Sequence, residues 1–345
     1  MNRENIIPES LDIELTWRCN ENCIHCYLKH SKPQLDMDDE TISNLLSEIK
    51  KNKIQRILLT GGEVFLHPRI FYIIEKLNDL NIYPTIFTNF TKCSKNDLDR
   101  LSSLKIKLIQ TSLYSMKEDI HDKVTGIKGS FEKTKFAIEY LNNLGIKIEV
   151  ACPLTKINYK DLFEVVCYCD SLNIKSGADF FIFGEYENLN NNLSYRLEKD
   201  ELIELFEINK KYFPKYLYFW GKQNWYKNIN KISDIKFFDL KSVYINPKGE
   251  VCPMIGVDIV LGNINNKSLF EIINSNKAIE LENITMSNFK ECENCDSIEH
   301  CVPCFNNHYN ENGKRLDKLN NEFCNYVKFK KDIYSKLLEV NNEKK

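Results

Sequence analysis

The sequence has no strong excess of charge of either sign, no long apolar run and few residues that break regular structure. Its 345 residues include 47 basic and 49 acidic side chains, and the formal net charge of -2 argues against binding nucleic acid or anionic lipid through bulk electrostatics. No apolar run approaches about 18 residues, so no membrane-spanning helix is expected. With only 12 Gly and 9 Pro, a collagen-like or low-complexity chain is excluded.

The N-terminus also lacks a secretory signal, because MNRENIIPES has no basic start followed by an apolar segment. We therefore expect a cytoplasmic protein whose thiols stay reduced. That expectation makes the 13 cysteines the most informative feature of the composition. In a reducing compartment, grouped cysteines more often bind metal or perform chemistry than form disulfides, so structural zinc and iron–sulfur ligation are both open.

The first half of the sequence alternates between short apolar segments and segments of helical period. Expected strands cover residues 11–17, 56–60, 83–88, 107–113, 147–151 and 178–183. Expected helices cover residues 39–51, 68–80, 95–104, 130–144 and 161–172, with Asp38 and Ser130 as N-caps. Six strands with helices between them predict a parallel sheet that curls into a partial (β/α)6 barrel.

The alternation ends after Gly184. A polar, Asn-rich stretch over 185–194 precedes an expected helix over 199–212, and residues 212–226 are rich in aromatic side chains. This aromatic segment is expected either to pack in a core or domain seam or, together with Tyr27, to line a substrate cavity.

From about residue 236 the pattern changes to short strands, turns and cysteines. VYINPKGEVC predicts a hairpin, and residues 325–345 predict a terminal helix. The sequence therefore predicts a barrel domain over 1–185 and a small, cysteine-rich α+β domain over 236–345, joined by residues 186–235.

Three cysteines stand close together directly after the first expected strand. Cys19, Cys23 and Cys26 form C-x3-C-x2-C, and three thiolates on one short loop can hold three corners of a [4Fe–4S] cluster. The fourth iron then lacks a protein ligand and can bind a small molecule, as catalytic metals with an open position do. The loop would lie at the carboxyl end of a parallel strand, where barrel active sites are built. Zinc binding or thiol redox chemistry is the alternative.

This loop resembles the signature of the radical S-adenosylmethionine (radical SAM) enzymes, C-x3-C-x-aromatic-C, in which His25 fills the aromatic position. The resemblance implies that the open iron binds the amino and carboxylate groups of S-adenosylmethionine. Reductive cleavage would release methionine and a 5′-deoxyadenosyl radical that removes a hydrogen atom from a substrate. The electron would come from an external donor such as flavodoxin or ferredoxin.

Further motifs agree with this family in content and order over about residues 10–185. Gly61, Gly62 and Glu63 follow the second strand, and the resemblance implies that this GGE holds the methionine amino group. A glycine pair lets backbone approach a ligand closely, and a carboxylate can accept hydrogen bonds from an ammonium group. Asn89 and Ser112 end the third and fourth strands, at positions that often contact the cofactor in the family.

The stretch HDKVTGIKGSF after the fourth strand also resembles the family. It begins with His121 and Asp122. Thr125 departs from the pattern, because many relatives have Arg there, so a carboxylate contact is not carried over to this side chain.

A second group of cysteines lies near the C-terminus. Its members are Cys292, Cys295, Cys301 and Cys304, spaced C-x2-C-x5-C-x2-C, with Cys252 before them and Cys324 after them. Four thiolates could close a tetrahedral zinc site. The gap between the two pairs is nevertheless short for a zinc ribbon, which has about 15–20 residues there.

This second pattern resembles the SPASM extension of radical SAM enzymes, which carries auxiliary iron–sulfur clusters. The resemblance implies one complete auxiliary [4Fe–4S] cluster, whose ligands are Cys292, Cys295, Cys301 and Cys324. Cys252 and Cys304 remain for a second cluster. The family pattern has further cysteines upstream of the position of Cys252, and residues 220–251 contain none. The second cluster is therefore expected to be incomplete, differently ligated or absent.

Auxiliary clusters beside a radical site imply an electron acceptor or a substrate anchor, and therefore oxidised products. Enzymes similar in both halves mostly modify peptides and proteins, so maturation of a ribosomal precursor peptide is the leading hypothesis. Because the first strand starts by Leu11, no room is expected for an N-terminal leader-binding domain. Leader recognition would then need a separate protein or the C-terminal domain itself.

Three other functions stay open. Sulfatase-maturing (formylglycine) enzymes share the architecture, but in them an Asp follows the cysteine that matches Cys252, where this chain has Pro253. A small-molecule dehydrogenase or a haem-biosynthesis enzyme is the second alternative. A non-catalytic iron–sulfur carrier is the third, and the retained GGE and open-iron motifs argue against it.

Overall fold

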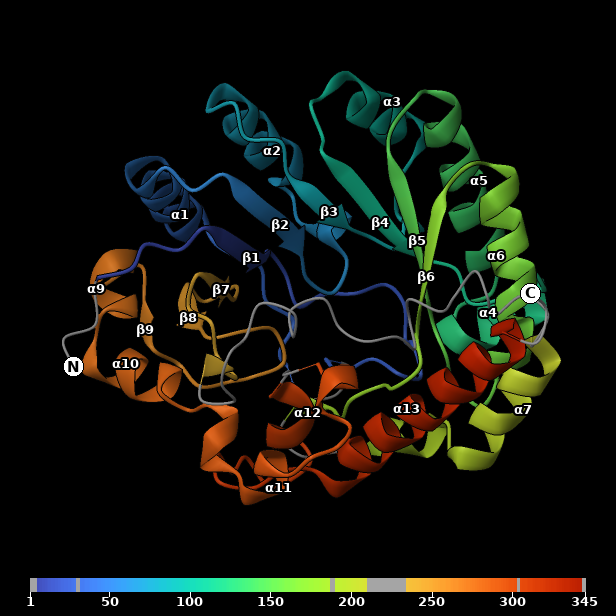
Figure 1. Cartoon of the computed structure of the whole chain (residues 1–345). Helices are drawn as coiled ribbons and strands as arrows, with labels where there is room; N and C mark the ends of the chain where they lie inside the picture. The colour runs from blue at the N-terminus through green and yellow to red at the C-terminus, as the bar shows by residue number, and fades with distance from the viewer. Residues whose placement is uncertain (1–4, 29–31, 187–189, 210–233, 303–304, 343–345) are drawn as a thin grey trace.

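One curved sheet runs through the protein (Figure 1). The computed structural model describes residues 5–28, 32–186, 190–209, 234–302 and 305–342. The described strands follow the order β6-β5-β4-β3-β2-β1-β7-β8-β9. Since β6 and β9 do not pair with each other, the sheet forms an open, partial barrel.

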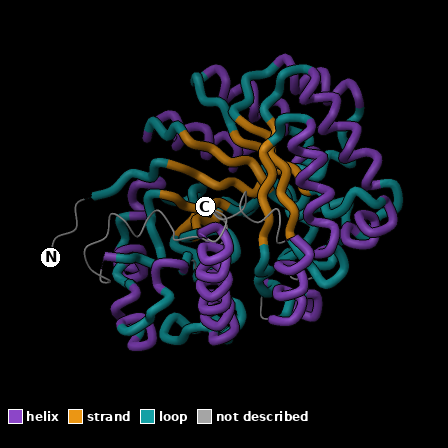
Figure 2. Tube along the Cα trace, turned by 45° about the vertical axis from the view of Figure 1, so that its right-hand side comes forward, coloured by secondary structure: helices purple, strands orange, loops and turns teal. Residues whose placement is uncertain are grey.

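Six parallel strands form the first part of the sheet in chain order. They are β1 (Ser10–Glu14), β2 (Arg56–Thr60), β3 (Thr85–Phe87), β4 (Leu108–Ser112), β5 (Ile148–Pro153) and β6 (Lys175–Asp179). The helices between them are α1 (Asp39–Asn52), α2 (Ile70–Asp79), α3 (Lys95–Ser103), α4 (Glu118–Thr125), α5 (Ser130–Asn143) and α6 (Leu162–Ser171). Figure 2 shows helices along the outer side of the strands. The expected parallel α/β partial barrel is confirmed.

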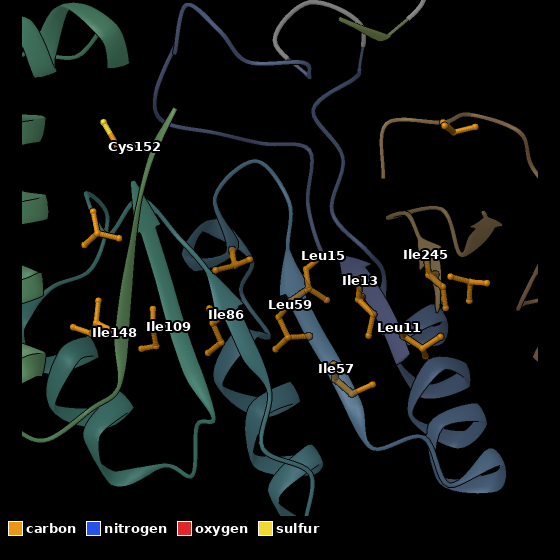
Figure 3. Packing of buried hydrophobic residues seen from close by; sticks show 14 of the residues in the cluster. Leu11, Ile13, Leu15, Ile57, Leu59, Ile86, Ile109, Ile148, Cys152 and Ile245 are labelled. Atoms are coloured by element: carbon orange, nitrogen blue, oxygen red, sulfur yellow. The ribbon is translucent and has the colours of Figure 1, made fainter. Parts of the chain in front are cut away.

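Side chains that alternate along each strand face either the apolar core or the interior of the barrel. In β1 and just beyond it, Leu11, Ile13 and Leu15 are fully buried and pack in the core between sheet and helices (Figure 3). Successive side chains of a strand point to opposite faces, so Asp12 and Glu14 lie on the other face of the sheet. This polar inner face is where a ligand cavity can form.

Two helix starts show how local hydrogen bonds set the element bounds. Asp38 caps α1 as expected, because its carboxylate accepts a hydrogen bond from Thr41 N at 2.8 Å. The expected cap at Ser130 is wrong: Ser130 lies inside α5, and its hydroxyl donates to Asp122 Oδ1 at 2.7 Å. Asp122 also accepts from the Phe131 N–H at 2.9 Å, so it holds the start of α5 from a distance in sequence.

Two strands have other bounds than the apolar pattern indicated. β1 ends at Glu14 rather than Trp17, and Thr16 beyond it forms an antiparallel bridge with Asp36. β6 covers Lys175–Asp179, whereas the apolar run over 178–183 mostly follows it. Phe180 and Ile182 in that run are buried, so its apolar character reflects packing rather than strand pairing. The helix α4 was not expected from the sequence.

The C-terminal half adds a hairpin and short helices. Its elements are α7 (Lys199–Asn209), β7 (Ser242–Ile245), β8 (Glu250–Cys252), β9 (Gly262–Asn263), α9 (Leu269–Ile273), α10 (Asn276–Glu282), α11 (Lys290–Glu293), α12 (Asn306–Tyr309) and α13 (Asn321–Asn342). The antiparallel β7–β8 hairpin is confirmed. β7 also pairs in parallel with β1, so the barrel sheet continues past residue 235. The proposed domain limits stay a prediction, and the aromatic segment 212–226 and Cys304 lie outside the described residues.

Among the described residues, no helix is both long enough and apolar enough to cross a membrane.

Candidate active site

The three N-terminal cysteines line a cavity of about 540 Å³ inside the barrel. The cavity lies at the carboxyl ends of β1 to β4, the end of a barrel where active sites are built. Its size falls within the roughly 300–1,000 Å³ of small-molecule sites. Lining segments include the loop after β1, here called the cysteine loop (residues 17–28), and the ends of β2, β3 and β4. Its sequence-predicted members are Cys19, Cys23, Cys26, His25, Tyr27, Gly61, Gly62, Asn89 and Ser112.

Backbone hydrogen bonds hold the cysteine loop against the end of α4. Asn22 N donates to Thr125 O at 2.8 Å, and Ile24 N donates to Val124 O at 3.0 Å. Thr125 also lines the cavity, so its carbonyl supports the loop while its side chain borders the site. Because no regular element forms within the loop, these contacts are what orient its thiols.

The two glycines after β2 let that strand approach the cysteine loop. A Cβ on Gly61 would lie 2.4 Å from Thr16 O, and a Cβ on Gly62 would lie 2.2 Å from Arg18 O. Both distances are shorter than any real Cβ contact. The close approach permits the hydrogen bonds Gly62 N–Thr16 O at 2.7 Å and Glu63 N–Arg18 O at 2.8 Å. The glycine pair is therefore required first by the backbone of the loop, and it also borders the cavity.

Glu63 is not among the described residues that line the cavity. Its side chain is fully buried and accepts hydrogen bonds from Thr88 Oγ1 at 2.7 Å, Asn89 N at 2.7 Å and Phe65 N at 3.0 Å. Burial raises the pKa of Glu63, and these three bonds oppose that rise. The contact with the methionine amino group that the GGE motif predicts for Glu63 stays a prediction. Glu63 positions the end of β3, and the backbone of Gly61 and Gly62 reaches the cavity wall.

Asn89 connects β3 with the cysteine loop. Its Nδ2 donates to Cys19 Sγ at 3.8 Å, and the Glu21 N–H donates to the same sulfur at 3.4 Å. Donors to sulfur stabilise a thiolate and tune an iron–sulfur cluster. Ser112, from the end of β4, borders the cavity on the other side. The strand ends thus bring Asn89, Ser112 and the cysteine loop to one cavity.

His25, within the cysteine loop, borders the cavity. Burial lowers the pKa of His25 to about 4, and its Nε2 lies 2.9 Å from Tyr114 Oη. The Tyr114 backbone N–H donates to His121 Nδ1 at 3.3 Å, and burial also lowers the pKa of His121 to about 4. These rings form an uncharged wall of the cavity, which His25, Tyr114 and His121 all line.

Glu21 and Tyr114 are among the lining residues that sequence reasoning missed. The Cys23 thiol donates to Glu21 Oε2 at 3.3 Å, and burial raises the pKa of Glu21 to about 7. Tyr114 Oη lies 4.0 Å from Cys23 Sγ. Two signals in the sequence could have identified these residues. Glu21 lies between two clustered cysteines, and Tyr114 lies just after the fourth strand.

The Tyr27 phenol links the cavity to a buried carboxylate. Tyr27 Oη donates to Glu14 Oε1 at 3.3 Å, and Trp17 Nε1 donates to Glu14 Oε2 at 2.7 Å. Tyr244 Oη, from β7, donates to the same carboxylate. Burial raises the pKa of Glu14. This network joins the cysteine loop, β1 and the C-terminal hairpin into one unit.

The donor set of the cysteine loop fits an iron–sulfur cluster. Burial raises the pKa of Cys19 to about 12, and the nearby Cys26 thiol adds to the rise. No three described His, Cys, Asp or Glu side chains converge on one point that could hold a single metal ion. In a cubane cluster each thiolate binds a different iron, so the ligands need not converge. Three thiols around one cavity, with N–H donors to the Cys19 sulfur, meet that requirement.

Four C-terminal cysteines line a second cavity of about 330 Å³. Cys292 comes from α11, Cys295 follows it, Cys301 follows the short helix Ile298–His300, and Cys324 lies in α13. Burial raises the pKa of Cys292 to about 12, and the thiols of Cys324 and Cys295 add to the rise. The structure thus brings together the four residues that the resemblance assigned to one auxiliary cluster.

Cys252 lies apart from this group, at the end of β8. It is 1% exposed, and burial raises its pKa to about 12. The charged groups that act on its thiol are Glu250, Asp258, Lys32 and Glu14, with no described cysteine among them. Cys252 does not line the four-cysteine cavity, and Cys304, the other residue expected for a second cluster, lies outside the described residues.

Family models match both halves of the chain. The radical SAM superfamily model matches residues 13–166, and the SPASM model, an iron–sulfur cluster-binding domain, matches residues 237–296. The chain is therefore a radical SAM enzyme with a SPASM domain. The family models confirm the expected cofactors. These are a [4Fe–4S] cluster, S-adenosylmethionine and auxiliary iron–sulfur clusters of the SPASM domain.

Curated relatives point to more than one substrate class. The chain is 27% identical to the antilisterial bacteriocin subtilosin biosynthesis protein AlbA of Bacillus subtilis, over 89% of this chain and 69% of AlbA. It is 24% identical to the sporulation killing factor maturation protein SkfB of the same species, over 86% and 70%. It is 23% identical to the AdoMet-dependent heme synthase of Methanosarcina barkeri, over 51% of each.

Solved structures share the fold. Streptococcus suis SuiB bound to its precursor peptide SuiA aligns with a TM-score of 0.67 at 18% identity, over 92% of this chain and 76% of that one. The enzyme anSMEcpe with bound AdoMet and a peptide aligns with a TM-score of 0.72 at 20% identity, over 98% and 100%. At these identities the likeness shows the architecture and leaves the substrate open.

Proposed function

We propose that this radical SAM enzyme oxidatively modifies a ribosomally made precursor peptide. The observation that carries the proposal is the pairing of two thiol-lined cavities, one with three cysteines and one with four. Three thiols leave one iron of a cubane cluster open for a cofactor, and four close a cluster that can only exchange electrons. An enzyme with both can remove a hydrogen atom and then accept the remaining electron.

The relatives favour a peptide over a small molecule. AlbA and SkfB, both named for the production of bacterial peptide products, match 86% or more of this chain. Two solved structures of the same fold hold peptides. We therefore place a precursor peptide in the barrel. The proposal includes a cytoplasmic setting, an external electron donor and, as an open element, a separate leader-recognition protein.

Different residues of the first cavity would bind the cluster and the cofactor. Cys19, Cys23 and Cys26 would hold the [4Fe–4S] cluster, and the backbone of Gly61 and Gly62 would border the amino-acid end of S-adenosylmethionine. When bound, the cluster and S-adenosylmethionine supply the radical chemistry that removes a hydrogen atom. Asn89 orients Cys19, and the uncharged rings of His25 and Tyr114 exclude water from one wall.

Haem-type chemistry is the second candidate, because heme synthases match about half of this chain or more. A sulfatase-maturing activity is disfavoured by Pro253 after Cys252. In the structure Cys252 is also buried beside the Glu14 network, away from the four-cysteine cavity.

The test is mass spectrometry on peptides encoded beside the gene. The enzyme is reconstituted anaerobically with iron, sulfide, S-adenosylmethionine and a reductant, and each synthetic peptide is added in turn. A mass change of one peptide, matched by formation of 5′-deoxyadenosine, supports the proposal. Unchanged masses for every neighbouring peptide, together with conversion of a porphyrin precursor, would assign the enzyme to haem-type chemistry instead.

A further inference from the structure

A buried lysine lies where the barrel meets the cysteine-rich half of the chain. Lys330 of α13 is 6% exposed. It lines a third cavity of about 450 Å³, here called the side cavity, which lies between α13 and the segment that follows β6. Figure 1 shows α13 running past the lower end of β6. The ammonium group of Lys330 is therefore held largely out of water, between the two cysteine regions.

The side cavity and the four-cysteine cavity share a wall. His300 and Val302 line the side cavity, whereas Cys301 between them lines the four-cysteine cavity. On α13, Val327 lines both cavities. Lys330 follows Val327 by three residues, which places it on the same face of the helix, about one turn further on. Lys330 thus lies beside the wall that carries the Cys301 thiol.

Contacts along α13 hold this wall in place. Lys331 Nζ donates to Asp296 Oδ2 at 2.8 Å, and Asp296 directly follows Cys295. The ring centres of His300 and Tyr334 lie 5.3 Å apart. The place of Lys330 relative to the auxiliary thiols is therefore set by the packing of α13, not by a free surface side chain.

The Lys330 ammonium group and the Cys301 thiol act on each other. Burial and the neighbouring thiols raise the pKa of Cys301, and the charge of Lys330 opposes that rise. Burial lowers the pKa of Lys330 to about 8, and Cys301 opposes that fall. The charges around an iron–sulfur cluster help to set its reduction potential, and a nearby positive charge favours the reduced state, which carries one more electron. Lys330 is placed to have this effect.

A second lysine of α13 offers a comparison. Lys328 lines the four-cysteine cavity and acts on the Cys324 thiol, but its side chain is exposed. Glu291, also exposed, acts on the same thiol with the opposite sign. Water and salt screen an exposed charge much more strongly than a buried one. Lys330 should therefore influence a cluster in this cavity more than Lys328 or Glu291 does.

The side cavity also borders the cysteine loop. His25 and Tyr27 line both the side cavity and the active-site cavity. Lys330 and these two residues therefore border one space, which lies between the three N-terminal thiols and the four C-terminal ones. An electron that leaves a substrate in the barrel for the auxiliary cluster moves toward the positive charge of Lys330.

We propose that the buried charge of Lys330 raises the reduction potential of the auxiliary cluster and so makes it a better acceptor for the electron of the substrate. After losing a hydrogen atom, the substrate gives up one electron, which reduces the cluster, and one proton, which passes to water. Lys330 is neither oxidised nor reduced, and it acts only through the cluster. The inference rests on the proposed function, because that function needs an internal electron acceptor.

Anaerobic potentiometric titration, followed by electron paramagnetic resonance, tests the inference on the full chain. Cys23→Ala is the background, because the auxiliary cluster should then be the one cluster that gives a signal. Lys330→Met in this background should lower the reduced-to-oxidised ratio at the background midpoint by about 10-fold, a shift of about 59 mV for a one-electron couple. Lys328→Met should shift the midpoint less, and Lys336→Met, at an exposed position further along α13, should leave it unchanged.

Lys330→Arg separates charge from packing. Arginine keeps the positive charge, so Lys330→Arg should keep the midpoint of the background. Iron analysis of each variant, expected at about 4 per chain, checks that the cluster still assembles. An unchanged midpoint in Lys330→Met would overturn the inference. An equal fall in Lys330→Arg and Lys330→Met would show that packing matters rather than charge, and would overturn it as well.

Peptide assays on the chain with Cys23 intact separate this inference from the proposed function. Lys330→Met should form 5′-deoxyadenosine as before but give less modified peptide for each cofactor cleaved, and Lys330→Arg should restore the yield. Peptide modification together with an unchanged midpoint in Lys330→Met contradicts the inference alone. A shifted midpoint with no peptide modified contradicts the proposed function alone. If Cys23→Ala holds zinc and no reducible cluster, both fall.

Discussion

The two cysteine regions of this chain differ in how they are assembled. The N-terminal group takes all three thiols from one loop of eight residues, so it is local in sequence. The C-terminal group takes four thiols from elements spread over 33 residues, and Cys324 joins it only because α13 folds back. The first therefore depends on the contacts of one loop, and the second on the packing of a whole domain.

Their surroundings differ as well. The first cavity is bordered by polar side chains and strand-end backbone, among them Glu21, Asn89 and Gln110. The second is bordered mainly by apolar side chains, among them Phe237, Met286 and Leu319. Polar groups around an open metal position suit the binding of a cofactor, and an apolar shell suits a closed electron-transfer centre. This comparison supports the proposal of radical chemistry for the first region and electron transfer for the second.

The largest expected effect comes from breaking the first region. Cys23→Ala should abolish formation of 5′-deoxyadenosine, because two thiolates do not hold a cubane, and iron should fall from about 8 to about 4 per chain. Iron and sulfide analysis and chromatography of the products check both. Cys167→Ala, an exposed thiol on α6, is the control and should change neither. Retained cleavage in Cys23→Ala would contradict the assignment of the open cluster.

Removing a cysteine of the C-terminal group should separate cofactor cleavage from peptide modification. Cys324→Ala is expected to reduce iron by a similar amount, from about 8 to about 4 per chain, while 5′-deoxyadenosine still forms. The modified peptide should be lost, because the electron left after hydrogen removal has no acceptor. Product chromatography and peptide mass measure the split. Loss of cofactor cleavage to the same extent as in Cys23→Ala would show that the regions are not independent.

A smaller effect is expected from the glycine that permits the loop packing. Gly62→Ala places a Cβ 2.2 Å from Arg18 O, and the resulting shift should lower the free energy of unfolding by about 1–3 kcal/mol. S-adenosylmethionine should also bind more weakly, since Gly62 lines the cavity. Denaturant unfolding and equilibrium binding measure both. Gly145→Ala, where a Cβ meets nothing within 4 Å, should weaken stability alone.

The smallest effect is expected at Cys252. Because Cys252 does not line the four-cysteine cavity, Cys252→Ala should leave iron at about 8 per chain, and the removal of one buried sulfur should cost little stability. Iron counting decides this. A fall of about 4 irons in Cys252→Ala, from a wild type that holds about 12, would instead show a third cluster that includes this residue.

Much of the first region was predictable because its signals are local. Cys19, Cys23 and Cys26, the glycine pair and the strand ends at Asn89 and Ser112 could all be found from spacing and strand periodicity. Glu63 could not be placed, because its hydrogen bonds to Thr88 and Asn89 are made across neighbouring strands. The same is true of the cap at α5, where Asp122 rather than Ser130 accepts the bonds.

In the C-terminal region, less could be predicted, because most of its features depend on contacts between distant segments. Spacing identified its four cysteines, but the pairing of β7 with β1 left no trace in either segment, since any apolar strand could occupy that edge. The burial of Lys330 likewise depends on how α13 packs against the rest of the chain. It cannot be inferred from the position of Lys330 in a helical period alone.

The sequence by itself therefore determined the enzyme family, the parallel barrel and the two groups of thiols, because each depends on periodicity or spacing within a short segment. Only the tertiary structure decided the hydrogen-bond partners of Glu63, the position of Cys252 outside the four-cysteine cavity and the continuation of the barrel sheet into the C-terminal half. These features depend on contacts between residues distant in sequence, and such contacts are selected by packing and hydrogen bonding of the whole chain.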